Sequence, residues 1–243
     1  MTGRAEFLTR IRREVAKTSG LFGASTAPRP AHPTAAADAI RRELSERWPQ
    51  ALDRFREEFE RVGGIFHRVP TLDSVAGTVA SIARERGATR LVTWDPDALG
   101  FDLGPALARE GLAVAAARAG EDDQSARVRH RGEAAAAQLG VTAADFVLAE
   151  TGTLILLSGA GRPRSTSLLP DVHVAVFGRD RLLETLEQVG VMLEALHAEA
   201  DRVMSGAMIN FITGPSRTAD IELTLTRGVH GPKEVHAIFV EGS

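Results

Sequence analysis

Short apolar segments alternate with amphipathic segments along the first half of this chain. Three segments between residues 65 and 117 have the apolar, β-branched character of strands, and the two segments between them have apolar residues at helical spacing. The strand-like segments are residues 65–69, 91–94 and 112–117, and the helix-like segments are residues 72–86 and 103–110. Alternation of this kind is typical of βαβ units, whose strands are parallel. It predicts an α/β fold with a mainly parallel sheet flanked by helices.

The remainder of the chain extends the pattern. Apolar residues recur at helical spacing from residue 40 to residue 62, where Pro49 predicts a kink or a restart of the helix. Further helices are predicted over residues 121–139 and 181–196, and further strands over residues 172–177, 208–212 and 235–240. These segments are enough for one large α/β core.

The N-terminal region has a different character. Residues 1–18 place Phe7, Ile11 and Val15 on one helical face, and residues 19–37 are rich in Gly, Ser, Pro and Ala. We expect a helical arm, a linker and an α/β domain over residues 38–243. The arm can pack on its own domain or on another molecule. The linker favours a contact with a second copy of the chain, and hence a homo-oligomer.

The charge balance excludes some classes of partner. Among 243 residues, 29 basic and 32 acidic side chains give a formal net charge of -3, which offers no electrostatic reason to expect nucleic acid. Residues 1–15 carry charges throughout, unlike a signal peptide, and no apolar run approaches the roughly 20 residues that span a bilayer. We expect a cytoplasmic protein without membrane insertion.

The chain contains no cysteine. Since cysteine thiolates are the usual ligands of iron–sulfur clusters, an ordinary cluster is excluded, and electrons would have to pass through a partner or a cofactor of unknown identity. No HExxH motif occurs, and His230 and His236 are further apart than the helical i, i+4 interval. We expect no metal site. Structural, hydrogen-bonded roles are expected for His67, His130, His173, His197 and His236.

Polar residues are densest between residues 209 and 240, where two apolar segments enclose glycines, prolines and charges. Gly214 and Pro215 predict a rigid corner after the preceding strand, because glycine adopts angles closed to other residues and proline fixes its own φ. After this corner, Ser216 is a suitable N-cap and Gly228 a suitable end for a short helix.

The start of this predicted helix suits an anion. Free backbone N–H groups there attract negative charge, Arg217 adds a forked donor, and the hydroxyls of Ser216 and Thr218 add others. In the structural alternative, Ser216 caps the helix, Asp220 favours its dipole and Arg217 lies in solvent. For Ser216 considered by itself, the structural role is favoured. The whole group of polar residues in the two loops favours a ligand site over residues 214–220 and 228–232.

A second glycine and proline pair, Gly231 and Pro232, places His230 on a tight loop before the last strand. Imidazole has the unperturbed pKa nearest neutrality, which makes His230 the best candidate proton carrier of this region. Asp220 is a further candidate. We assign Gly231 to the predicted ligand-binding loop.

Glu150 lies between two apolar runs, DFVLA and TLILL, and is followed by Thr151, Gly152 and Thr153. Gly152 allows a hairpin turn or the close approach of a ligand to the backbone. A glutamate at a turn is commonly a solvated connector, and both threonines can bind a ligand or satisfy backbone groups. Glu150 is therefore a candidate catalytic carboxylate, and the structural alternative stays open.

Residues 158–167, SGAGRPRSTS, combine glycines, arginines and hydroxyls that can wrap an anion. Arg162 or Arg164 would supply charge, and Arg164 is preferred because it lies beside the hydroxyl cluster. A flexible surface loop is the equal alternative. Neither a Walker loop nor a GxGxxG fingerprint is present.

Several of these segments carry a family resemblance. The segments GPSRTADIE (214–222) and GVHGP (228–232) resemble the closing signature of the LUD domain of bacterial lactate-utilisation proteins, as do AETGTL (149–154) and LLP (168–170) upstream. The resemblance covers roughly residues 40–240, is strongest after Asp145, and is closest to the C type of these proteins. It adds Glu222 to the candidate ligand-binding residues.

The resemblance implies a setting in lactate metabolism. The C type is similar to one component of a three-protein system that oxidises L-lactate to pyruvate, in which sibling proteins carry the iron–sulfur cysteines. The family's fold is related to the group of ribose-phosphate isomerase, glucosamine-phosphate deaminase and the CoA transferases. Some members of that group use a carboxylate near a glycine, for which Glu150 is the nearest equivalent.

Three functional hypotheses follow. In the first, a small carboxylate or phosphorylated ligand binds in an electropositive hollow shared by Glu150, Arg217 and His230, and the chain contributes to lactate oxidation. In the second, the chain is a non-catalytic assembly subunit that docks on an iron–sulfur sibling. The third, a sugar-phosphate isomerase or CoA transferase activity, is weaker because the full signatures are missing. Whether the chain catalyses a reaction alone is left open.

Overall fold

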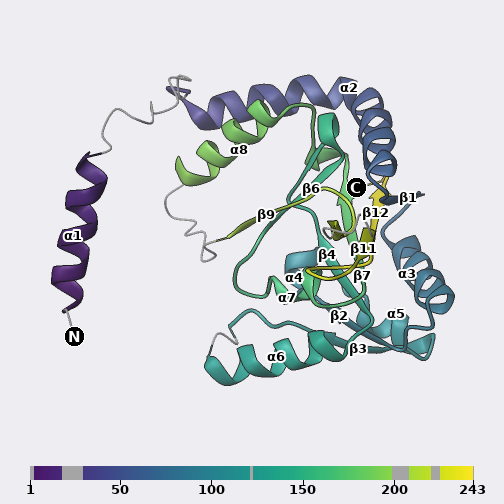
Figure 1. Cartoon of the computed structure of the whole chain (residues 1–243). Coiled ribbons are helices and arrows are strands. Elements are labelled where there is room, and N and C mark those ends of the chain that lie inside the picture. Colours follow the sequence, from purple (N-terminus) through teal and green to yellow (C-terminus); the bar gives the residue numbers. More distant parts are fainter. Residues whose placement is uncertain (1–2, 18–29, 121–122, 199–207, 220–224, 243) are drawn as a thin grey trace. The chain divides into compact units, whose positions relative to one another are not determined.

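The computed structural model describes residues 3–17, 30–120, 123–198, 208–219 and 225–242 (Figure 1). The chain divides into two compact units, Met1–Ala31 and His32–Ser243. In the first unit, the described element is α1 (Arg4–Lys17), which occupies most of the residues expected to form the arm.

The second unit contains all the other elements. Its helices are α2 (Pro33–Arg61), α3 (Asp73–Glu85), α4 (Pro96–Leu99), α5 (Gly104–Arg109), α6 (Gln124–Ala136), α7 (Ser165–Leu168) and α8 (Leu186–Ala198), with 3₁₀ turns η1 (Ala149–Thr151) and η2 (Arg179–Arg181). Its strands are β1 (Ile65–Val69), β2 (Arg90–Thr93), β3 (Ala113–Ala116), β4 (Leu139–Ala143), β5 (Phe146–Leu148), β6 (Thr153–Leu157), β7 (Val172–Gly178), β8 (Leu182–Leu183), β9 (Ile209–Ile212), β10 (Arg217–Ala219), β11 (Leu225–Arg227) and β12 (Glu234–Val240).

Six strands form a sheet in the order β1, β12, β7, β4, β2, β3, and every neighbouring pair is parallel. β12, near the end of the chain, lies inside the sheet and pairs with β7 from Glu234 opposite Val172 to Val240 opposite Gly178. The predicted α/β fold with a parallel sheet is confirmed. The strand predicted at residues 65–69 has the same bounds as β1.

One face of this sheet is covered by α3 and α5. Val75 and Val79 of α3 and Leu107 of α5 pack in one buried cluster with Val174 and Ile238 of the sheet. The i, i+4 spacing of the two valines places both on the same side of their helix. Burying each aliphatic side chain stabilises the fold by about 1.5–3 kcal/mol.

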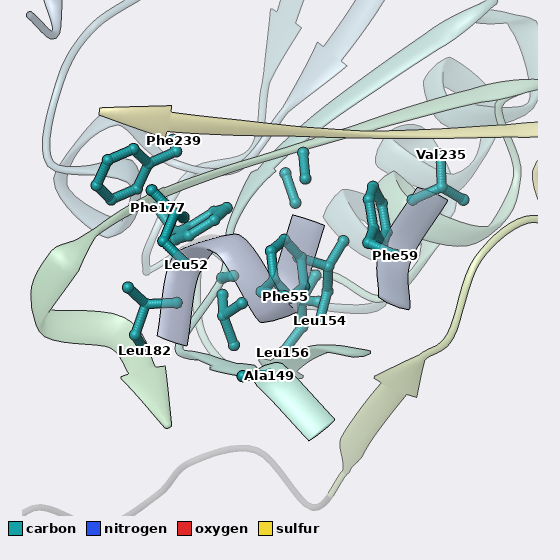
Figure 2. Close-up of a cluster of buried hydrophobic side chains, with 14 of the residues drawn as sticks. Leu52, Phe55, Phe59, Ala149, Leu154, Leu156, Phe177, Leu182, Val235 and Phe239 are labelled. Atoms are coloured by element: carbon teal, nitrogen blue, oxygen red, sulfur yellow. The ribbon is translucent and has the colours of Figure 1, made fainter. Parts of the chain in front are cut away.

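The opposite face packs against α2 and a second sheet. Figure 2 shows Phe55 and Phe59 of α2 in one buried cluster with Phe177, Phe239 and Val235 of the large sheet and Leu154 of the second sheet. The Phe55 and Phe177 rings meet edge to face, with centroids 5.4 Å apart. Helix α2 is therefore a central element of the core.

The second sheet has the order β8, β5, β6, β9. β5 and β6 form the antiparallel hairpin that was one alternative predicted around Gly152. Along β6, Leu154 and Leu156 face α2, whereas Ile155 packs with Val189 and Met192 of α8. Burial on both faces explains why the segment TLILL is continuously apolar.

Helix α2 contains Pro49 within its span. Figure 1 shows that its ribbon changes direction along its length, as expected where proline removes a backbone donor. The helix begins at Pro33, so it includes residues 33–37, which the sequence pattern assigned to the end of the linker. Proline is favoured in the first turn of a helix because the N–H groups there have no intrahelical partner.

The predicted helix over residues 181–196 needs a correction at its start. Leu182 and Leu183 instead form β8, which pairs with Val147 and Leu148 of β5, and the helix α8 begins at Leu186. Both leucines are buried, and the gain from burying them in the sheet outweighs the helical periodicity of this segment.

The histidines expected to be structural are hydrogen-bonded, as predicted. The bonds join His67 Nε2 to His236 Nδ1 (2.9 Å), His173 Nε2 to Thr142 Oγ1 (2.9 Å), His130 Nε2 to Thr166 Oγ1 (3.2 Å), and His197 Nδ1 to the Leu193 carbonyl (2.8 Å). Among the described helices, none combines the length and apolar character needed to cross a bilayer.

Candidate functional site

The corner predicted after residue 212 is present. Gly214 has a left-handed φ of 79°, which disfavours any side chain. A Cβ at this position would also lie 2.7 Å from the Val62 carbonyl oxygen, so the corner packs closely on the end of α2. Pro215 follows and is buried. The corner directs the chain away from β9 toward the predicted site.

The short helix predicted after Ser216 is wrong. β10 and β11 form an antiparallel pair there, with Arg217 opposite Arg227 and Thr218 opposite Thr226. β-branched threonines favour strands, and the ladder satisfies backbone groups that a helix would otherwise use. The predicted anion site at a helix start is therefore not formed by this segment.

Ser216 instead links two loops that are distant in the sequence. Its N–H donates to the Pro232 carbonyl (2.9 Å), and its carbonyl accepts from the Gly228 N–H (3.1 Å). The His230 N–H lies 3.4 Å from the Ser216 hydroxyl oxygen, which accepts from it. These bonds hold the loops at residues 214–216 and 228–232 side by side, as the sequence pattern predicted.

A pocket of about 380 Å³ lies where these loops meet β9 and α7. Arg164, Ser216 and His230 line it, together with predicted residues Gly214 and Gly231. Within the described part of the chain, Arg164 has no ion-pair partner. An exposed guanidinium, a hydroxyl and an imidazole lining one pocket offer donors for a carboxylate or phosphate and a group able to move a proton.

Arg217 is not among the residues that line this pocket. Its guanidinium donates to the Val62 carbonyl and lies against Gly63, so this arginine fastens β10 to the end of α2. Asp220 and Glu222 lie outside the described residues. For Thr218, the backbone pairing in β10 is the described feature.

Glu150 also lies apart from the pocket. Its carboxylate accepts a hydrogen bond from the Leu186 N–H at 2.6 Å, and its own N–H donates to the Glu184 carbonyl at 3.1 Å. Leu186 is the first residue of α8, where backbone donors lack intrahelical partners and negative charge is favoured. The described contacts of Glu150 therefore serve this helix start, and neither Glu150 nor Arg217 lines the pocket that contains His230.

Comparison with known proteins identifies the family. The LUD domain profile matches residues 52–240. The chain belongs to the LUD domain family. The lactate utilization protein C of Halalkalibacterium halodurans is 39% identical over 171 residues, 70% of each chain. That of Shouchella clausii is 36% identical over 156 residues, which cover 64% of each chain and so less than two thirds of that relative.

A solved structure shares the fold of this LUD domain. A DUF162 family protein from Deinococcus radiodurans superposes with a TM-score of 0.53 over 79% of this chain and 98% of that protein, at 23% identity. The likeness supports the α/β architecture.

Three threonine hydroxyls form a hydrogen-bonded row that extends from the pocket into the LUD domain. Thr213 lines the pocket, its Oγ1 lies 2.7 Å from Thr153 Oγ1, and Thr153 Oγ1 lies 2.7 Å from Thr151 Oγ1. Gly152 between them has a φ of 61°, and a Cβ there would overlap the backbone of Phe59. The close approach expected at Gly152 is thus made by α2. Thr213 was missed, although a polar residue directly after a strand and before Gly214 is a usable signal.

The two arginines of the loop at residues 158–167, Arg162 and Arg164, have different surroundings in the LUD domain. Arg164 lines the pocket beside Ser216, whereas Arg162 donates through Nη1 to Asp145 at 2.7 Å. Burial raises the pKa of the Asp145 carboxyl, and the Arg162 charge opposes that rise. The preference for Arg164 in the predicted site agrees with this placement.

Proposed function

We propose that this LUD domain chain is a component of an L-lactate utilisation system, which oxidises L-lactate to pyruvate, and that it binds a small carboxylate in the pocket lined by Arg164, Ser216 and His230. A small phosphorylated ligand is the alternative occupant of the same pocket. The proposal for the system rests on the relatives named lactate utilization protein C. The proposal for the site rests on the gathering of these three side chains.

The roles of the pocket residues follow from their chemistry. A guanidinium pairs with both oxygens of a carboxylate, so Arg164 is the proposed anchor. The Ser216 hydroxyl is a neighbouring donor or acceptor, and His230 is the proposed proton carrier. Glu150 and Arg217, which are engaged elsewhere, carry no part of this proposal.

The proposed partners are proteins that hold the iron–sulfur clusters which this chain cannot bind. Without cysteine it has no ligands for an ordinary iron–sulfur cluster, so the electrons of lactate oxidation are proposed to pass to iron–sulfur sibling proteins in the cytoplasm. The exposed pocket wall would then present a substrate or product to such a sibling. The N-terminal arm is the proposed contact for self-association.

Calorimetric titration of the full chain with L-lactate, pyruvate and inorganic phosphate tests the ligand. We expect saturable binding of a carboxylate that weakens by about tenfold in Arg164→Gln, because a charge-assisted pair is lost. Arg56→Gln is the matched control: it removes an exposed arginine of α2 that has a 3.6 Å pair with Asp53, and it should leave affinity unchanged. Equal weakening by both substitutions would contradict the assignment.

The absence of cysteine also favours a second candidate, a non-catalytic assembly subunit. In that case the chain docks on the iron–sulfur sibling, and the loops fixed by Ser216 form a docking face. The same titrations distinguish the assembly role from the small-anion site. No binding of any of the three ligands, with retained binding to the sibling protein, would support the assembly role and remove the small-anion proposal.

A further inference from the structure

A larger pocket, of about 620 Å³, lies at the carboxyl end of β3. Ala115 and Ala116 of β3 and the following residues 117–118 form part of its wall, and residues of α6 and residues 158–163 form the rest. In parallel α/β sheets, ligands bind preferentially outside the carboxyl ends of the strands. The volume is within the range of about 300–1,000 Å³ that is usual for pockets of small-molecule ligands.

The charges around this pocket are strongly one-sided. Its described lining contains four arginines, Arg118, Arg127, Arg129 and Arg162, against a single carboxylate, that of Glu133. Within the described residues, Arg127 has no ion-pair partner. Guanidinium groups suit phosphate oxygens in particular, so a lining rich in arginine favours a phosphate ligand.

Two of the basic side chains are held in place. Arg162 donates to Asp145 at 2.7 Å, and its guanidinium carbon lies 5.5 Å from the centroid of the Trp94 ring. His130 is buried, with Nε2 3.2 Å from Thr166 Oγ1. Side chains fixed before a ligand arrives lose little conformational freedom on binding, which is a property of a built site.

The loop from residue 158 to residue 163 is also rigid. Gly159 and Arg162 exchange backbone hydrogen bonds of 3.2 and 3.0 Å. Gly161 has a φ of 67°, and a Cβ there would lie 2.7 Å from Asp95 Cβ, so the loop packs closely on the end of β2. The described residues provide no hydrogen-bond acceptor for the N–H groups of Ala160 and Gly161. These N–H groups are available to an anion in the pocket.

Neighbouring acids balance part of this charge. Asp145 pairs with Arg162. The pKa of Asp95 is lowered by the hydrogen bond from the Ala119 N–H and, to a smaller extent, by the Arg118 charge. Asp95 accepts the N–H groups of Asp97 and Ala119 at 2.9 Å, and Asp145 accepts from the Leu157 N–H and from Arg162. Neither acid lines the pocket. The small side chains along β3 leave uncharged space beside the arginines, which suits a ligand with a neutral part.

We propose that this pocket binds the diphosphate group of a nucleoside diphosphate or a ligand of that class. Arg118, Arg127 and Arg162 would hold the phosphate oxygens, and the alanine-lined wall of β3 would receive the nucleoside. This site is separate from the pocket of Arg164 and His230, and it does not depend on the function proposed above.

The test is calorimetric titration of the full chain with ADP, AMP, adenosine and inorganic pyrophosphate. We expect ADP to bind at least as tightly as pyrophosphate and about tenfold more tightly than AMP, because each charge-assisted phosphate contact adds affinity. Adenosine should show no saturable binding. Affinity for ADP should fall with rising salt. Pyrophosphate binding without ADP binding would overturn the proposal, as would the absence of binding by both at millimolar concentration.

Substitutions of pocket residues test whether ADP binds in this pocket. Arg118→Gln with Arg127→Gln, two exposed positions, should weaken ADP binding at least about tenfold. Arg131→Gln removes one positive charge from α6 at a position outside the pocket lining, and Arg164→Gln removes one from the other pocket. Each should retain wild-type affinity for ADP, and so should the double variant Arg131→Gln with Arg164→Gln, which removes two charges. Circular dichroism verifies that each variant is folded. Affinity unchanged in Arg118→Gln with Arg127→Gln, or lost equally in Arg131→Gln with Arg164→Gln, would overturn the assignment.

Discussion

At the scale of single residues, glycines decide how closely this chain packs. Gly152 has a left-handed φ of 61°, and a Cβ there would overlap the backbone of Phe59. Gly77 lies exposed within α3, and a Cβ there would meet nothing within 4 Å. The two positions therefore separate a glycine that the fold requires from one that it tolerates.

Gly152→Ala should lower the free energy of unfolding by about 3 kcal/mol, because it combines backbone strain with overlap against α2. Gly77→Ala should raise it by up to about 1 kcal/mol, because alanine has a higher helix propensity. Urea unfolding of both variants measures these changes. A destabilisation of similar size at both positions would contradict the role given to Gly152.

At the scale of secondary-structure elements, buried histidines couple the sheet to pH. His173 on β7 is fully buried, and burial, with a smaller contribution from His236, lowers its pKa from 6.5 to about 3. Burial also lowers the pKa of His236 on β12, and the neighbouring His67 adds to that effect. Both rings are thus neutral in the folded protein over a range in which the unfolded chain takes up protons.

Stability should therefore decline as pH falls below about 6.5, by about 1.4 kcal/mol per pH unit for each neutral buried histidine. The change His173→Gln keeps a polar atom near Thr142 but cannot titrate, so the slope between pH 6 and pH 5 should decrease by about that amount. Urea unfolding at several pH values measures the slope. Above pH 7 the free energies of unfolding of the two proteins should change with pH in the same way. An unchanged slope between pH 6 and pH 5 would refute a neutral His173.

Elements were predictable from sequence where one local pattern dominated. Ile65–Val69 became β1 because its apolar residues have no competing helical pattern, and the hairpin around Gly152 followed from two apolar runs separated by a turn. The helix expected after Ser216 failed because capping residues and β-branched threonines gave opposite signals, and the pairing of β10 with β11 decided between them. Tertiary context overrides such local preferences.

The candidate site was predictable only in part, for a related reason. Gly214 and His230 belong to neighbouring loops whose turns are visible in the sequence, and the pocket contains both. The Val62 carbonyl that receives Arg217, and the helix start that receives Glu150, belong to distant segments. No local pattern indicates which backbone group a long polar side chain will meet.

At the scale of the whole molecule, the chain consists of a small N-terminal unit and a large unit with its own core. The large unit, His32–Ser243, contains all three described sheets and every buried cluster described above, so we expect it to fold alone. The first unit contributes α1, where Phe7 and Ile11 lie four residues apart on one helical face and no other described element of that unit covers them.

A chain that begins at His32 should therefore keep its cooperative unfolding transition within about 0.5 kcal/mol, since surface deletions away from a core have small effects. If the arm mediates self-association, as proposed, the molar mass from light scattering should fall from that of an oligomer to that of one chain. Phe7→Ser with Ile11→Ser in the full chain should reproduce that fall while conserving length. An oligomer that survives both changes would exclude the arm as the contact, because the truncated chain lacks α1 altogether.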